Sequence, residues 1–171
     1  MSFSHIIFFY FIVYSFLGWI IEGLFNFFTK KSFIKPNFLY LPFKPMYGIA
    51  AVILVLLKDR IPFVPFLICS FIVPSFIEYL TAFLLFQSFH LKYWDYSHTP
   101  YNLSGYVCLR FSIYWLFLSL LLVYGVHPFI FLLYQKINWF WLYFFPIMLL
   151  IFIIDSFLSI KSKMRSIISS K

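Results

Sequence analysis

Residues 5–28 read HIIFFYFIVYSFLGWIIEGLFNFF, and Glu22 is the only Asp, Glu, Lys or Arg residue among them. A helix needs about 20 mostly apolar residues to cross the hydrocarbon core of a bilayer. The stretch lacks the alternation of polar and apolar residues that marks the strands of a membrane barrel. It is also too long for the apolar region of a signal peptide. We therefore predict a first membrane-spanning helix, and we expect it to be retained.

The composition of the whole chain agrees with this prediction. Of its 171 residues, 64% are hydrophobic and 11% are charged, and the mean hydropathy is +0.96. A soluble domain carries about 25% charged residues, because its surface must stay hydrated. The composition excludes a water-soluble enzyme, a nucleic-acid-binding module and a disordered tail.

Further apolar stretches alternate with proline-rich, charged or polar segments. We predict an all-α polytopic membrane helix bundle of about five transmembrane helices, with residues 1–171 forming a single integral membrane domain. The predicted spans are residues 5–28, 46–57, 61–89, 107–134 and 139–160. The second span is short for a full crossing, so a segment that re-enters the membrane is the alternative there.

The net charge of +8 predicts an orientation, because Lys and Arg accumulate in cytoplasmic loops. With five spans, one side receives ten basic residues: Lys30, Lys31, Lys35, Lys44, Lys92, Arg110, Lys161, Lys163, Arg165 and Lys171. The other side receives Lys58, Arg60 and Lys136. We expect the N-terminus outside and the C-terminus in the cytoplasm. The proline-rich loop after the first span and the polar aromatic loop before the fourth are then cytoplasmic.

Acidic residues within the spans are candidate site residues, because a charge inside a bilayer persists only when it is paired, protonated or near water. Glu22, Glu78 and Asp155 each lie toward the cytoplasmic half of a predicted span. Asp95 in the aromatic loop and Arg110 at the start of the fourth span are expected at the same depth. We predict a polar cavity that opens to the cytoplasm. The alternative is that these groups pair to fix helix packing or lie among lipid headgroups, and for Asp155 we expect the headgroup position.

Polar aromatic residues near these acids extend the candidate cluster. Trp94 adjoins Asp95, which is suited to accept backbone hydrogen bonds in the turn that it begins. Tyr47 follows Pro45, a residue suited to the first turn of a helix. The predicted substrate-binding or structural polar cluster comprises Glu22, Glu78, Asp95, Arg110, Tyr47, Trp94 and Asn102.

Other kinds of site have no support in the sequence. No glycine-rich phosphate loop ending in Gly-Lys-Ser/Thr is present, so the chain is not itself an ATPase. The four histidines and two cysteines lack metal-ligand spacing. There is no Gly-x-Ser-x-Gly nucleophile motif. We predict no metal, no cofactor and no enzymatic activity.

Several short motifs together resemble one family. They are YSFLGW at residues 14–19, PMYG at 45–48, EYLT at 78–81 and WDYS at 94–97. Over about residues 8–130 the chain is similar to CmpB-like bacterial membrane proteins described as putative ABC-transporter type IV permeases. The resemblance implies a multi-pass protein of the bacterial cell membrane that takes part in transport. The energy for transport would then come from a separate ATPase subunit.

Two functions remain open from the sequence. The first is a transporter membrane subunit that binds a small substrate in the cytoplasmic-side cavity. Glu22 and Glu78 would line that site, and Asp95 and Arg110 would organise its gate. Because five spans are few for a complete pathway, a homodimer or a partner subunit would be required. The second is a non-transporting membrane interaction or lipid-binding protein whose polar cluster is structural. Both have the lipid bilayer as a partner and neither involves nucleic acid.

Overall fold

The computed structural model describes residues 3–34 and 36–169. Lys35 and Lys171, two basic residues expected in the cytoplasm, lie outside the described residues. The elements in chain order are α1 (Phe3–Lys30), α2 (Pro45–Lys58), α3 (Phe63–Phe89), β1 (Asn102–Leu103), β2 (Val107–Cys108), α4 (Leu109–Leu120), the π-helix η1 (Leu121–Val126) and α5 (His127–Ser169). The prediction of an all-helical fold is therefore confirmed, apart from one small hairpin.

Three helical stretches of the described chain are long and apolar enough to cross a membrane: Phe3–Lys30, Phe63–Phe89 and the continuous stretch Leu109–Ile168. α2 has 14 residues, fewer than a full crossing requires. Large apolar side chains cover the outer faces of the helices, as on Phe129, which is 73% exposed. Such faces suit an acyl-chain environment. The number of crossings stays a prediction.

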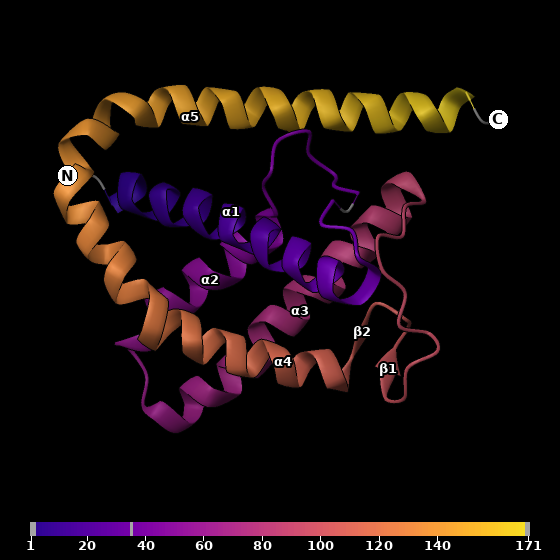
Figure 1. Ribbon diagram of the computed structural model, residues 1–171, viewed down its shortest axis with the longest axis horizontal. Helices are drawn as coiled ribbons and strands as arrows, with labels where there is room; N and C mark the ends of the chain where they lie inside the picture. The colour runs from indigo at the N-terminus through magenta and orange to yellow at the C-terminus, as the bar shows by residue number, and fades with distance from the viewer. Residues whose placement is uncertain (1–2, 35, 170–171) are drawn as a thin grey trace.

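The fourth and fifth predicted spans are not separated by a loop, and this expectation was wrong. Helical structure runs without interruption through residues 135–138, where a connection was expected. The chain reverses by bending within α5. In its first part α5 runs antiparallel to α1, because His127 lies beside Tyr14 and Trp141 donates a hydrogen bond to the carbonyl oxygen of His5. After the bend, the rest of α5 passes along α1 in the same direction as α1 (Figure 1).

A change in helical hydrogen bonding precedes α5. The N–H of His127 donates to the carbonyl oxygen of Leu122, five residues earlier, which is the π-helical pattern. Pro128 follows directly and has no N–H to donate, so a regular α-helix would lose a hydrogen bond here. The helix therefore widens locally before His127 and Pro128, and it continues through them.

Glycine residues allow α1 and α2 to approach each other closely. A Cβ atom added to Gly18 of α1 would lie 2.7 Å from Cδ1 of Tyr47, and one added to Gly48 of α2 would lie 2.8 Å from Cδ2 of Phe11. Pro45 occupies the first turn of α2, as predicted, where its missing N–H costs nothing. The ring of Tyr47 is thereby held against the backbone of α1.

The two long loops contact each other. They are residues 31–44 and residues 90–108, and the Tyr93 hydroxyl of the second donates to the carbonyl oxygen of Asn37 in the first, at 3.3 Å. The hairpin of β1 and β2 pairs antiparallel and was not predicted. The hairpin and the C-terminal ends of α1 and α5 lie toward the same end of the long axis (Figure 1). Which membrane side this end faces stays a prediction.

Candidate functional site

A cavity of about 340 Å³ lies where α1, the start of α2, α3, α4 and the loop before β1 meet. Its volume is at the lower end of the range for small-molecule sites, roughly 300–1,000 Å³. Aromatic side chains form much of its wall, among them Tyr47, Tyr93, Trp94, Tyr96, Tyr114 and Trp115. The cavity therefore combines a size suited to a small organic molecule with a largely aromatic surface.

The structure brings most of the predicted site residues to this cavity. Its lining includes Glu22, Glu78, Asp95, Tyr47 and Trp94. They come from α1, α3, the aromatic loop and α2, which are distant in the sequence. Two other members of the predicted cluster, Arg110 and Asn102, do not line the cavity.

Glu78 is the most deeply buried acid of the lining, with only 3% of the residue exposed. Its Oε1 accepts a hydrogen bond of 3.0 Å from the Tyr96 hydroxyl, and its Oε2 accepts one of 2.7 Å from the Trp115 indole N–H. Hydrogen bonds to an ionised acceptor are stronger than those between neutral groups. Glu78 thus connects α3 to both α4 and the aromatic loop.

Tyr96 is set up to remain a donor to Glu78. Burial raises the pKa of the Tyr96 phenol well above its ordinary value, and the negative charge of Glu78 raises it further. The phenol therefore keeps its proton over the physiological pH range. Its ring also stacks on Phe111 of α4, with ring centroids 4.8 Å apart.

Glu22 forms an ion pair with Lys44, the residue that directly precedes α2. Both side chains are mostly buried, with 13% of Glu22 and 10% of Lys44 exposed. The backbone N–H of Lys44 also donates to the carbonyl oxygen of Ser15 in α1, at 2.9 Å. The ion pair and this hydrogen bond fix the end of the proline-rich loop against α1.

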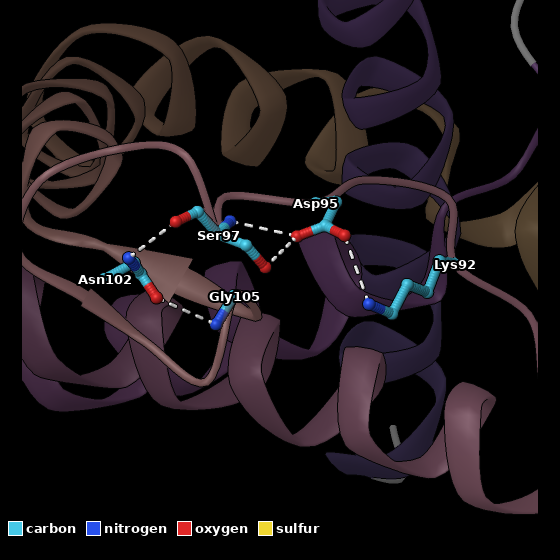
Figure 2. A network of polar contacts seen from close by, with 5 residues as sticks. All are labelled: Lys92, Asp95, Ser97, Asn102 and Gly105. Atoms are coloured by element: carbon cyan, nitrogen blue, oxygen red, sulfur yellow. Dashed lines mark hydrogen bonds and ion pairs between the residues drawn. The ribbon is translucent and has the colours of Figure 1, made fainter.

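Asp95 organises the polar loop beside the cavity, as Figure 2 shows. Its Oδ1 accepts hydrogen bonds from the backbone N–H of Ser97 at 2.9 Å and from the Ser97 hydroxyl at 2.5 Å. Its Oδ2 accepts one from the Lys92 ammonium group at 3.1 Å. The bonds from Ser97 first, and then Lys92, hold the pKa of Asp95 well below its usual range. The predicted backbone hydrogen bond to Asp95 is therefore confirmed.

Asn102 shapes the hairpin rather than the cavity wall. Its amide group donates to the carbonyl oxygen of Ser97, and its Oδ1 accepts from the N–H of Gly105 (Figure 2). The amide group also donates to the carbonyl oxygen of Thr99. Gly105 has φ +72°, and a Cβ atom there would lie 2.9 Å from Oδ1 of Asp95. Asn102 and Gly105 together place the loop that carries Asp95.

A second, smaller cavity of about 50 Å³ adjoins the first. Both cavities are lined by Ile21, Tyr47, Trp115 and Leu118. The rings of Tyr47 and Trp115 meet edge to face, with centroids 5.1 Å apart and planes at 69°. This aromatic pair therefore stands at the boundary between the two cavities.

Arg110 and Asp155 lie elsewhere. Arg110 is exposed, and its Nε donates to the Tyr114 hydroxyl at 3.1 Å, so it contacts a cavity residue from outside. Asp155 is only 6% exposed, where a headgroup position was expected. Its two carboxylate oxygens accept the backbone N–H groups of Tyr40 and Leu41, each at 3.1 Å. Asp155 therefore attaches the proline-rich loop to α5.

The comparison with protein families decides the assignment. The sequence model of the family described as Putative ABC-transporter type IV matches residues 9–160. The chain belongs to this family. Together with the long apolar helices, membership of the ABC-transporter type IV family indicates an ABC-transporter-related membrane protein. Searches of curated proteins and of solved structures gave no match.

In this member of the ABC-transporter type IV family, sequence reasoning missed the partners of both intramembrane glutamates. Trp115 and Tyr96 bind Glu78, and Lys44 binds Glu22. A general signal existed for Trp115, since a buried indole N–H requires an acceptor. No spacing in the sequence pointed to Lys44. Among the residues that the structure describes, no group of three His, Cys, Asp or Glu side chains could hold a metal ion.

Proposed function

We propose that this ABC-transporter type IV protein is a transporter membrane subunit that binds a small substrate in the cavity of about 340 Å³. The observation that carries the proposal is the convergence of Glu22, Glu78 and Asp95, from separate segments, on that cavity. Ionisable residues that face a cavity within a membrane protein are typical of substrate and ion pathways. Family membership supports transport as the process.

The role that we propose for each residue of the cavity follows from its position. Glu78 and the surrounding aromatic residues form the binding wall, and the Tyr47–Trp115 pair closes the passage to the smaller cavity. ATP hydrolysis takes place on a separate subunit, because the sequence has no phosphate-binding loop. Two copies of the chain, or one copy with a partner, complete the pathway. The bundle lies in the bacterial plasma membrane with its C-terminus in the cytoplasm.

Recovery of the ATPase tests this proposal directly. The tagged full chain is purified from its native membrane after chemical crosslinking, and the bound proteins are identified by mass spectrometry. We expect an ATPase subunit whose hydrolysis rate in nanodiscs depends on this chain. Repeated recovery of the chain without any nucleotide-hydrolysing partner would overturn the proposal.

Glu78→Gln separates transport from a structural role of the cavity. The substitution keeps an acceptor for one of the two hydrogen bonds but removes the charge. A transporter subunit should be produced at a normal level and lose the stimulation of its ATPase. A lipid-binding or interaction protein should instead show a lower folded yield with no separate loss of activity. Asp59→Asn, at the exposed end of α2, is the control.

A further inference from the structure

We propose that the cavity binds an uncharged aromatic molecule, which reaches it from the lipid bilayer through an opening between α1 and α4. This inference rests on the proposed function, because it names the class of substrate and the side from which the substrate enters. Three features support it: the pairing of the charges in the wall, the aromatic rings, and the exposure of the cavity edge.

The acidic side chains of the wall are engaged by the protein itself. Glu22 forms an ion pair with Lys44, and Asp95 forms one with Lys92. Both carboxylate oxygens of Glu78 accept hydrogen bonds, one from the aromatic loop and one from α4. A charged ligand must give up hydration on entering, and a buried charge without a partner is strongly disfavoured. An uncharged ligand has no such penalty and leaves these contacts intact.

The remaining charged residue of the lining has a different setting. Lys30 lies in the last turn of α1 and is exposed, so its ammonium group can stay hydrated. The attraction between opposite charges at an exposed position is small, because water and salt screen it. Lys30 therefore contributes little to the affinity for an anionic ligand.

Aromatic side chains are the most numerous group in the cavity wall, with eight of its 17 residues. Several of the rings hold each other in place. Phe111 stacks on Tyr96 with centroids 4.8 Å apart, and Phe25 and Tyr114 meet Phe111 edge to face at 5.9 and 5.5 Å. Aromatic pairs favour these geometries and gain more from them than from burial alone. A flat aromatic ligand can therefore join an ordered set of rings with little rearrangement.

The cavity has an apolar edge between α1 and α4. Ile21 and Phe25 of α1 and Tyr114 of α4 line the cavity and are 37%, 50% and 47% exposed. α1 packs against α2, α2 against α3 and α3 against α4, so α1 and α4 stand at the two ends of this series. The three exposed side chains lie within predicted membrane spans, where acyl chains surround them. The opening therefore faces lipid, from which an uncharged molecule enters more readily than a charged one.

The test compares three probes that share one ring system. They are 2-naphthylmethanol, which is uncharged, the cation 2-naphthylmethylammonium and the anion 2-naphthoate. Binding to the full chain in phosphatidylcholine nanodiscs is measured by equilibrium dialysis, and empty nanodiscs correct for partitioning into lipid. We expect saturable binding of 2-naphthylmethanol, at least about tenfold tighter than that of either charged probe, because a charge loses hydration in the cavity.

A variant at the apolar edge locates the binding. Phe25→Ala removes one ring and should weaken binding of 2-naphthylmethanol at least about threefold, the loss of one aromatic contact. Phe28→Ala is the matched control, because Phe28 is 73% exposed on the same helix and does not line the cavity. Equal affinities of the two variants would show that the probe binds elsewhere and would overturn the proposal. If Phe25→Ala fails to fold, the three probes on the wild-type chain still decide the class.

A spin label at residue 25 tests the route of entry. In a chain that carries Cys69→Ala and Cys108→Ala, the label is attached through Phe25→Cys or, as a control, through Asp59→Cys at the exposed end of α2. Oxygen concentrates in the bilayer, whereas a nickel chelate stays in water. We expect the label at residue 25 to collide mainly with oxygen, and less often after 2-naphthylmethanol is added. The label at residue 59 should collide mainly with the chelate.

The outcomes that would overturn the proposal are distinct. Equal or tighter binding of either charged probe would exclude the uncharged class, and so would the absence of saturable binding of 2-naphthylmethanol. Collisions mainly with the nickel chelate at residue 25 would exclude entry from lipid. None of these results changes the recovery of an ATPase, so failure of this proposal is distinguishable from failure of the proposed transport function.

Discussion

The carboxylate of Glu22 forms an ion pair with the ammonium group of Lys44, so that α1 holds the residue from which α2 begins. Both side chains lie mostly out of solvent, and Glu22 also lines the cavity. An ion pair in such a place is expensive to break from one side, since the remaining charge keeps its desolvation cost. Removing one partner of the pair should therefore destabilise the protein more than removing both.

Lys44→Met should destabilise the protein by about 3–5 kcal/mol, the usual cost of removing one partner of a buried pair. The double variant Glu22→Gln/Lys44→Met should recover much of that loss, because neither charge of the pair is then left without the other. The fraction of monomer that remains in detergent after heating measures both effects. A double variant no more stable than Lys44→Met would contradict the prediction.

Gly18→Ala should disturb the cavity through Tyr47. The new Cβ would lie 2.7 Å from Cδ1 of the Tyr47 ring, so the ring must shift away from α1. Overpacking of this kind costs about 1–3 kcal/mol. We expect a lower melting temperature, measured by the loss of monomer on heating in detergent.

Gly125→Ala is the matched control for this substitution. Its added Cβ would meet Cδ1 of Leu121 at 3.2 Å, and this atom is the end of a flexible side chain. Gly125 does not line either cavity described above. If the two alanine variants lowered the melting temperature equally, the role given to the Tyr47 ring would be wrong.

Asp95→Asn should lower stability at neutral pH and have little effect in acid. The folded-state pKa of Asp95 is depressed, chiefly by Ser97 and then by Lys92, so its ionised form contributes stability above the ordinary Asp pKa of about 4. That contribution is lost as the pH falls through the folded-state pKa. Unfolding curves of both proteins, recorded from pH 7 down to the lowest pH that the detergent tolerates, should converge. A stability difference independent of pH would contradict this account.

Asp155→Ala should release the proline-rich loop. The backbone N–H groups of Tyr40 and Leu41 would lose a charged acceptor, and such hydrogen bonds contribute about 1.5–3 kcal/mol each. We expect faster cleavage by trypsin at Lys31, at the start of this loop, followed on gels over time. Asp59→Asn serves again as the control, and equal cleavage of both variants would show that Asp155 does not hold the loop.

Much of the fold followed from composition and apolar run length. These properties predicted helices α1 to α3 within a few residues, because a bilayer sets both the length and the polarity of a spanning helix. They failed at residues 135–138, where Gln135, Lys136 and Asn138 suggested a loop. A helix satisfies its own backbone hydrogen bonds, so polar side chains within it do not require the helix to end.

The candidate site was only partly predictable. Glu22 and Glu78 could be selected because charge is rare inside a membrane helix, and both line one cavity. Their partners could not, since Trp115 and Lys44 approach them only after the helices pack. Arg110 was included for its charge and its expected depth, but it is exposed and reaches Tyr114 from outside the cavity.

The π-helical turns of η1 have a consequence for every contact that follows them. An additional residue relative to α-helical periodicity rotates the downstream helix by about 100°. Deleting one residue within Leu121–Val126 would reset that rotational phase while leaving the chemistry of α5 intact. The Tyr14–His127 contact and the attachment of Asp155 to the proline-rich loop would then be misaligned together. Distant contacts of α5 thus depend on one rotation of the helix about its axis, which the six residues of η1 determine.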